Sequence, residues 1–558
     1  MVRDNKIWIG VNTAGDAVYM EPKMSNRHGL IAGATGSGKT VTLKVLAETF
    51  SRLGVPVFLS DVKGDLAGLC MAGEESPDMN ERIGRFKLNE NHFEYTGFPS
   101  AFWDIYGQRG IQLRTTISEM GPVLLSRILG LNDLQSDILN IVFRIADEEG
   151  LLLIDTKDLK AMLNYVSDNN KDFEADYGRM SPVSISAIIR SVAALEIAGG
   201  DKFFGETALN INDFLTRSPD GRGMINILDS TSLVNNGTLY STFLLWLLSE
   251  LFETLPEVGD LDRPKLVFFF DEAHLLFNGA PKVFLDKIEQ VVKLIRSKGV
   301  GIFFITQNPG DIPDGILSQL SNKVEHALHA YTPADQKAVK AAAESFRVNP
   351  AFDTFETIMQ LGTGEAVVSF PDENGVPSMA ERVFILPPES KFGGISEAER
   401  DNEIKSSLLF GKYANAFDPD SAFEFLQRRG LEAEEEEKRL KEEAEAEKQR
   451  LKEEAEAEKQ REKEEAAALR QREREEAAAI RQREKEEAAA IKQAEREKAK
   501  KERQVKQAAK SVGNSVAGTV GREVGKQVGK SFGSFGKTLG GNVGASLGRG
   551  ILSTLFKL

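Results

Sequence analysis

Short apolar runs separated by helical stretches dominate the first 395 residues of the chain. Most of these runs are continuous rather than alternating, which is typical of strands in a parallel sheet that helices cover on both faces. Since helical patterns lie between the runs, we predict an α/β fold with a mainly parallel sheet over residues 1–395. The predicted strands are residues 30–33, 55–61, 224–229, 266–272, 301–306 and 365–370.

Three further segments differ from this pattern. Residues 85–222 contain few such apolar runs, so we interpret them as a mainly helical insertion in the sheet. Residues 396–430 are polar and predict a short helical connector. Only 32 residues precede Gly33, enough for a hairpin between residues 6–10 and 16–20.

Residues 431–510 form a charged segment with an 11-residue repeat, of which KEEAAALRQRE is one copy. Ala, Glu, Lys, Arg and Gln are strong helix formers, and pairs such as Arg472 and Glu476 at i,i+4 support an isolated helix. The period corresponds to about 3.67 residues per turn, so any supercoil would be right-handed. A solvated single helix and a weak coiled coil both fit, because large apolar residues are sparse.

Residues 511–558 form a glycine-rich basic tail. Glycine recurs every four positions from Gly521 to Gly533, and small residues at this spacing let helices pack closely. Arg522 and Lys526 would suit an anionic lipid surface. We expect helix self-association or peripheral membrane contact, with a flexible tail as the alternative, since each helical glycine costs about 1 kcal/mol.

The charge and the cysteine content of the chain limit which partners and which cellular compartment we expect. The formal charge of −15 is concentrated in residues 1–430, which carry 59 acidic and 41 basic residues. Such a body does not attract nucleic acid by bulk charge, so a DNA contact would need a local basic surface.

Cys70 is the one cysteine, which excludes a disulfide within the chain. Without an apolar signal stretch or a run long enough to span a bilayer, we expect a cytoplasmic protein, with a peripheral position at the inner membrane surface left open.

The sequence GATGSGKT at residues 33–40 matches the phosphate-binding P-loop pattern. It follows an apolar run and precedes a helical pattern, as a strand–loop–helix requires. Backbone N–H groups of such a loop and the helix N-terminus bind phosphate oxygens. Lys39 would reach the β- and γ-phosphates of ATP, and the Thr40 hydroxyl would bind Mg²⁺. The predicted nucleotide-binding residues are Gly33, Ala34, Thr35, Gly36, Ser37, Gly38, Lys39 and Thr40.

Two carboxylates, Asp271 and Glu272, end the apolar run LVFFF. Asp271 would hold Mg²⁺, and Glu272 would act as the general base that polarises the attacking water. A helix-capping role for this pair is the alternative. At the tip of another strand, Gln307 is placed to contact the γ-phosphate or the water. Arg296 would act in a neighbouring subunit as an arginine finger, or simply be a solvated helix residue.

At these motifs the chain resembles the HerA–FtsK class of P-loop ATPases. The segments RHGLIAGATGSGKT, DVKGD at residues 61–65, LVFFFDEAH and RSKGVGIFFITQNP carry the likeness, which is greatest to bacterial proteins with a HerA-like C-terminal domain. The resemblance implies a RecA-like core, a homo-oligomeric and usually hexameric ring, and double-stranded DNA as the polymer moved. It also implies Lys39, Thr40, Asp271, Glu272, Gln307 and Arg296 in the roles given above, with Asp61 near the metal.

We therefore expect an ATP- and Mg²⁺-dependent ring motor, a DNA translocase or helicase-like ATPase. Arg109, Arg114, Arg127 and Arg190 are candidate channel residues for DNA. A second hypothesis is an ATPase attached to a membrane surface or scaffold, which remodels a protein partner and uses the charged helix as a spacer. A third is a nucleotide-dependent assembly switch, for which a general base at Glu272 would be unnecessary.

Overall fold

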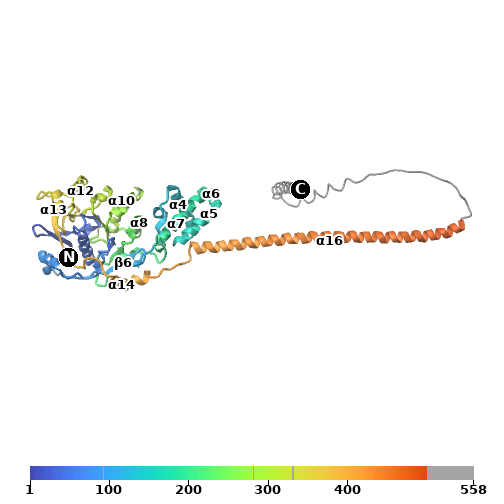
Figure 1. Cartoon of the computed structure of the whole chain (residues 1–558), viewed down its shortest axis with the longest axis horizontal. Helices are drawn as coiled ribbons and strands as arrows, with labels where there is room; N and C mark the ends of the chain where they lie inside the picture. The colour runs from blue at the N-terminus through green and yellow to red at the C-terminus, as the bar shows by residue number, and fades with distance from the viewer. Residues whose placement is uncertain (92, 260, 279, 281, 330–331, 499–558) are drawn as a thin grey trace. The chain divides into compact units, whose positions relative to one another are not determined.

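The computed structural model describes residues 1–498 except 92, 260, 279, 281, 330 and 331 (Figure 1). The chain divides into two compact units, Met1–Lys441 and Glu442–Leu558. The first unit holds the sheet and its covering helices, and the second begins within a long helix. The glycine-rich tail predicted at residues 511–558 lies outside the described residues.

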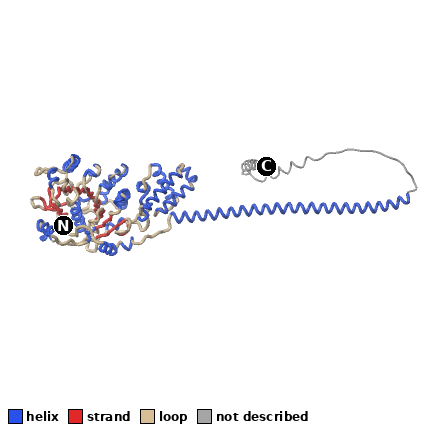
Figure 2. The backbone as a smooth tube through the Cα atoms, viewed as in Figure 1, coloured by secondary structure: helices blue, strands red, loops and turns tan. Residues whose placement is uncertain are grey.

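One sheet of 13 strands organises the first unit (Figure 2). Its order is β1-β2-β13-β12-β11-β4-β10-β9-β5-β8-β6-β7, with β3 paired to β2. From β11 to β7 all neighbouring strands run parallel, whereas β12, β13 and β2 join antiparallel. The strands are β1 Val2–Arg3, β2 Lys6–Asn12, β3 Ala17–Met20, β4 Gly29–Ala32, β5 Val57–Asp61, β6 Ser100–Asp104, β7 Ile111–Gln112, β8 Ile225–Asp229, β9 Leu266–Phe270, β10 Val300–Thr306, β11 Asn322–His326, β12 Glu365–Ser369 and β13 Glu381–Ile385.

The predicted α/β fold with a mainly parallel sheet is confirmed. Each of the six predicted apolar runs contains a strand, and β2 and β3 form the expected hairpin. Outside the insertion, the short strand β1 and the strands β11 and β13 were not predicted. Charged residues such as Lys323 and Arg382 interrupt the apolar patterns of β11 and β13. The segment 85–222 is only partly helical, since β6 and β7 lie within it and β6 pairs with β8 in the main sheet.

Helices α1, α10, α13 and α14 pack on the sheet, whereas α4 to α7 pack on one another (Figure 1). Capping boxes at Thr116, Asn132 and Asp155 begin α3, α4 and α5, so the insertion carries its own helix start signals. The helices are α1 Lys39–Arg52, α2 Pro77–Arg85, α3 Ile117–Ile128, α4 Asp133–Glu148, α5 Thr156–Asp168, α6 Asn170–Tyr177, α7 Pro182–Ile197, α8 Gly237–Thr254, α9 His274–Phe277, α10 Lys282–Ile295, α11 Asp314–Leu317, α12 Pro333–Glu344, α13 Thr354–Gln360, α14 Glu397–Ser406, α15 Phe410–Tyr413 and α16 Ala422–Lys498.

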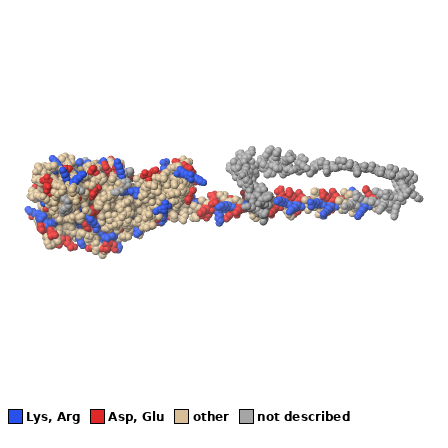
Figure 3. Space-filling model, turned by 45° about the horizontal axis from the view of Figure 1, so that its top comes forward, with Lys and Arg blue, Asp and Glu red and all other residues tan. Residues whose placement is uncertain are grey.

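Residues 431–498 of the charged segment lie within α16, a single helix of 77 residues, and residues 499–510 lie outside the described residues. It starts at Ala422, before the predicted position 431, because the connector already carries helix-forming residues. Lys and Arg alternate with Glu along it (Figure 3), and ion pairs such as Lys441–Glu437 join successive turns. In the repeat, the apolar side chains of Leu451, Leu469 and Ile480 are more than half exposed.

No single helix in the described part of the chain has both the length and the apolar character to cross a bilayer. The bent pair α6 and α7 meets these criteria only when its two helices are taken together.

An aromatic cluster joins α1 to the centre of the sheet. The Phe303 ring of β10 stacks on Phe269 of β9 at a centroid distance of 5.2 Å and lies 6.3 Å from Phe50 of α1. All three side chains are buried, Phe303 to 1% exposure. Such rings bury large apolar areas and hold the helix after the P-loop against the sheet.

Phe303→Ala should destabilise the protein by about 3–5 kcal/mol, because it leaves a cavity between α1 and the sheet. Urea unfolding followed by circular dichroism measures the change. Leu408→Ala is the matched control: Leu408 is 91% exposed, so its loss should shift stability by less than about 0.5 kcal/mol. Equal effects of the two substitutions would contradict this packing.

Candidate nucleotide-binding site

Four neighbouring parallel strands bring most of the predicted site residues to one edge of the sheet. The P-loop follows β4, Asp61 ends β5, Asp271 and Glu272 follow β9, and Gln307 follows β10. Because these strands run in the same direction, their carboxyl ends meet at this edge. We call it the catalytic edge.

The P-loop backbone has the conformation that its glycines permit. Gly33, Gly36 and Gly38 have φ angles of 147°, 78° and 118°. A Cβ atom on Gly33 would lie 2.5 Å from the Cβ of His326, so a larger residue would not fit there. The N-cap of α1 is Gly38, which provides no side-chain acceptor, so the first N–H groups of α1 have no cap from it. These features fit a phosphate cradle at a helix N-terminus.

The Lys39 ammonium group lies inside the loop. Its Nζ atom donates to the carbonyl oxygens of Gly33 at 2.5 Å and Ala34 at 2.8 Å. Burial is the main cause that lowers the pKa of Lys39, and the nearby positive charge of Lys63 lowers it further. The Ser37 hydroxyl donates to the Ala34 oxygen, and the Thr35 hydroxyl donates to Gln307 Oε1 at 3.2 Å, which links the loop to β10.

Oxygen ligands suitable for Mg²⁺ lie beside the first turn of α1. The Thr40 hydroxyl is 3.5 Å from Asp65 Oδ2, and the Asp65 Oδ1 atom is buried without a hydrogen-bond partner among the described residues. Asp271 is 7% exposed, and burial raises its pKa to about 7. Hydroxyl and carboxylate oxygens are what a hard divalent cation prefers. Mg²⁺ therefore fits this donor set.

The structure distinguishes the two aspartates of DVKGD. Asp61 accepts hydrogen bonds from the backbone N–H groups of Gly64 at 2.7 Å and Leu66 at 3.1 Å, so both of its oxygens hold the loop. Burial raises the pKa of Asp61 to about 6. Asp65, rather than Asp61, faces Thr40. The sequence pattern pointed to Asp61 because it ends the strand, and only the loop path reveals Asp65.

The Glu272 carboxylate has three partners at the catalytic edge. It is 2.6 Å from Lys63 Nζ and 3.2 Å from His274 Nδ1, and it accepts from Gln307 Nε2 at 3.2 Å. Burial disfavours its charge, but the hydrogen bond and charge of Lys63 outweigh this and lower the pKa of Glu272. Its φ of 50° is unusual for a residue other than glycine, and such strain concentrates at functional sites.

Arg296 lies away from the catalytic edge. It opens the 3₁₀ turn η7 Arg296–Lys298, which precedes β10, whereas Gln307 follows that strand. A strand of 7 residues spans roughly 23 Å, so Arg296 is at the opposite edge from the P-loop of its own chain. If this guanidinium contacts a nucleotide, that nucleotide belongs to another subunit.

Two buried histidines have structural hydrogen bonds. His28 accepts from the Ile302 N–H through Nδ1 and donates to the Val292 oxygen through Nε2. His326 donates from Nδ1 to the Glu365 oxygen at 2.8 Å, so its Nε2 accepts from the Thr42 hydroxyl of α1, also at 2.8 Å. His326 thereby braces the P-loop and α1, a role its isolated sequence position did not indicate.

The four arginines expected to face a DNA channel differ in environment. Arg114 is 5% exposed and donates to the Tyr413 oxygen, so this expectation is wrong for Arg114. Arg109 pairs with Asp229 and Glu397, and Arg127 lies over the Phe284 ring. Arg190 on α7 is exposed. Among the four, Arg190 is the one that keeps an open position in the described structure.

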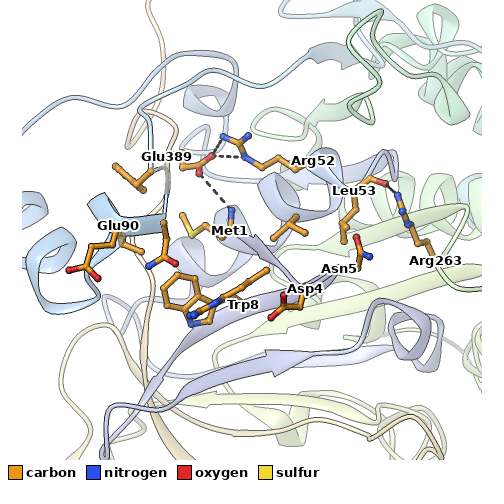
Figure 4. Close-up of a pocket in the computed structure, with 14 residues that line it drawn as sticks. Met1, Asp4, Asn5, Trp8, Arg52, Leu53, Glu90, Arg263 and Glu389 are labelled. Atoms are coloured by element: carbon orange, nitrogen blue, oxygen red, sulfur yellow. Dashed lines mark hydrogen bonds and ion pairs between the residues drawn. The ribbon is translucent and has the colours of Figure 1, made fainter.

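A cavity of about 720 Å³ lies at the other edge of the sheet (Figure 4). Residues before β5 and β9, such as Leu53 and Arg263, line it together with the N-terminal residues. Four of its charged groups have partners: Glu389 contacts both Arg52 and the Met1 ammonium, and Arg263 donates to the Leu53 oxygen. This cavity is separate from the residues at the catalytic edge.

The family model "Helicase HerA-like C-terminal" matches residues 6–538. A DNA double-strand break repair helicase HerA of Sulfolobus acidocaldarius is 22% identical over 353 residues, 62% of this chain and 62% of the relative. The HerA helicase of Sulfurisphaera tokodaii is 22% identical over 356 residues, 61% of this chain and 62% of the relative. The chain thus spans about three fifths of the length of these relatives.

Among solved structures, one match is the plasmid coupling protein TrwB in complex with ADP and Mg²⁺. The alignment covers 71% of this chain and 93% of that chain, at 16% identity and a TM-score of 0.49.

His326→Gln should show how the buried imidazole responds to pH. Burial lowers the pKa of His326 to about 4, below the unfolded value of 6.5, so its stabilising contribution is present above pH 6.5 and is lost as pH falls toward 4. The difference in unfolding free energy between wild type and His326→Gln should therefore shrink by about 2 kcal/mol from about pH 7 to about pH 5. Urea titrations at both pH values measure it. A difference independent of pH would contradict a neutral, buried imidazole.

Proposed function

Because the chain belongs to the helicase HerA-like C-terminal family, we propose that it is an ATP-hydrolysing motor of the HerA–FtsK class that requires Mg²⁺. One observation carries this proposal: the P-loop, Asp271, Glu272 and Gln307 meet at one edge of the sheet, joined by the hydrogen bonds of Gln307 to Thr35 and Glu272.

Each residue at the catalytic edge has a chemical role in this proposal. N–H groups of residues 33–40 bind phosphate oxygens, and Lys39 leaves its carbonyl partners to bind the β- and γ-phosphates. Glu272 holds the attacking water and takes its proton, while Gln307 fixes the orientation of Glu272. Mg²⁺, held by Thr40 and Asp271 with Asp65 nearby, would neutralise phosphate charge.

We propose that the motor is a homo-oligomer, with a hexameric ring as the expected form. The position of Arg296 at the opposite edge from its own P-loop supports this, because the residue can serve a nucleotide only across a subunit boundary. In a ring, each catalytic edge would receive Arg296 from the next subunit.

Double-stranded DNA is the proposed polymer. The support comes from the relatives, which carry the name DNA double-strand break repair helicase. Any contact would be to the phosphate backbone and independent of base sequence. On the face shown in Figure 3, acidic and basic side chains are interspersed, so the contact would have to be local.

A second candidate is a cytoplasmic ATPase held at a membrane surface or scaffold that remodels a protein partner. The net charge of −18 on residues 1–430 favours it, because this charge opposes binding to DNA. The 77-residue α16, about 115 Å long, would serve as its spacer.

ATP turnover with and without double-stranded DNA tests the proposal. Lys39→Ala and Glu272→Gln should each lower turnover at least about 100-fold, since the first removes a phosphate contact and the second the general base. Lys340→Ala, on the exposed side of α12, is the control and should match wild type. Stimulation by DNA supports the DNA motor, whereas turnover indifferent to DNA favours the protein-remodelling candidate. Full turnover in both site variants would contradict an ATPase at this edge.

Arg296 is tested by mixing two inactive variants. Arg296→Ala and Glu272→Gln should each be inactive alone, because each lacks one part of every composite site. Mixed oligomers contain interfaces where an intact Glu272 meets an intact Arg296, so part of the turnover should return. If Arg296→Ala is as active as wild type, or if mixing restores nothing, Arg296 does not act across subunits.

A further inference from the structure

Lys63 makes the shortest charged contact of the Glu272 carboxylate. Its Nζ atom is 2.6 Å from Glu272 Oε1, and the two side chains differ in exposure, 43% for Lys63 and 7% for Glu272. The lysine thus reaches from solvent into the catalytic edge. Neither the P-loop pattern nor the paired carboxylates of β9 predicted a second lysine at this place.

The loop that carries Lys63 is held at its base and open at its tip. The Asp61 carboxylate binds the N–H groups of Gly64 and Leu66, which fixes the turn. Gly64 has a φ of 78°, a conformation that favours glycine. Two residues after Lys63, Asp65 approaches Thr40 of the P-loop. One short loop therefore contacts both the proposed metal side and the proposed general base.

ATP binding would change the electrostatic surroundings of Lys63. In the described structure it interacts with Glu272, Asp271 and Asp65. The attacking water must lie between Glu272 and the γ-phosphorus, in line with the bond that breaks. A cation bound to Glu272 is therefore next to the γ-phosphate and farther from the β-phosphate.

We propose that Lys63 senses the γ-phosphate: without nucleotide it binds Glu272, and when ATP binds it moves to the γ-phosphate and frees Glu272 to hold the water. This inference rests on the proposed function of the catalytic edge. The transfer exchanges one charge-assisted hydrogen bond for another, so it requires no new group from outside the chain. ADP lacks the acceptor and leaves Lys63 on Glu272.

Nucleotide binding in a Glu272→Gln background tests the exchange. Glutamine cannot form the ion pair, and the parent should not hydrolyse ATP, so affinity is measured without turnover or competition from Glu272. Adding Lys63→Ala should weaken ATP binding about 10- to 100-fold, the range for a charge-assisted hydrogen bond. ADP binding should change less than about twofold. Isothermal titration calorimetry of both nucleotides, with Mg²⁺ present, gives the four affinities.

Three further variants in the same background separate the explanations. Lys63→Arg keeps the charge and should retain most of the preference for ATP. Lys39→Ala should weaken both nucleotides, since Lys39 reaches the β-phosphate as well. Lys340→Ala, an exposed lysine on α12, should change neither.

The outcomes discriminate the inference from the function on which it rests. An equal loss for ATP and ADP would show that Lys63 supplies only general positive charge, and no loss for either would show that it only holds Glu272. Both results overturn the sensing role and leave the ATP site intact. Failure of the Glu272→Gln parent to bind ATP would overturn the proposed function, and the inference with it.

Discussion

The parallel hydrogen bonding of β4, β10, β9 and β5 sets the position of every residue at the catalytic edge. Thr306 pairs with Ala32, so β10 and β4 end level, and Phe304 pairs with Phe270, so β9 ends two residues earlier and is followed by Asp271 and Glu272. A shift of one residue in β9 or β10 would turn the side chains of that strand to the other face and separate Gln307 from Glu272. The buried aromatic rings of α1, β9 and β10 hold this register, which makes the apolar core a condition for the chemistry.

The catalytic edge concentrates negative charge in a buried place. Asp61, Asp271 and Glu272 are all at most 7% exposed, and Asp65 lies beside them. Like charges in a region of low dielectric raise one another's pKa, in addition to the effect of burial itself, as seen for Asp271. Lys63 and Lys39 compensate part of this charge. A divalent cation would compensate more, so this concentration of negative charge favours Mg²⁺ with ATP.

The sequence predicted the parts of the site that local pattern encodes. GATGSGKT and the acidic end of LVFFF identify the P-loop and the Asp271–Glu272 pair because the chemistry needs those residues at fixed spacing. Local sequence patterns do not predict contacts between residues that are far apart in the chain. Asp65 and Lys63 depend on the path of a loop after β5, and His326 on the pairing of β11 with β4, a strand hidden by its charged residues. Arg114 was misplaced because charge alone does not reveal burial.

Mn²⁺ in place of Mg²⁺ gives the most direct test of the claim that the catalytic edge is a metal–nucleotide site. Electron paramagnetic resonance would count bound Mn²⁺ in the Glu272→Gln protein with and without ATP, and in the same protein carrying Asp271→Asn. The account predicts one tightly bound ion per chain that requires ATP and is weakened by Asp271→Asn. Ion binding that is indifferent to both ATP and Asp271 would contradict it.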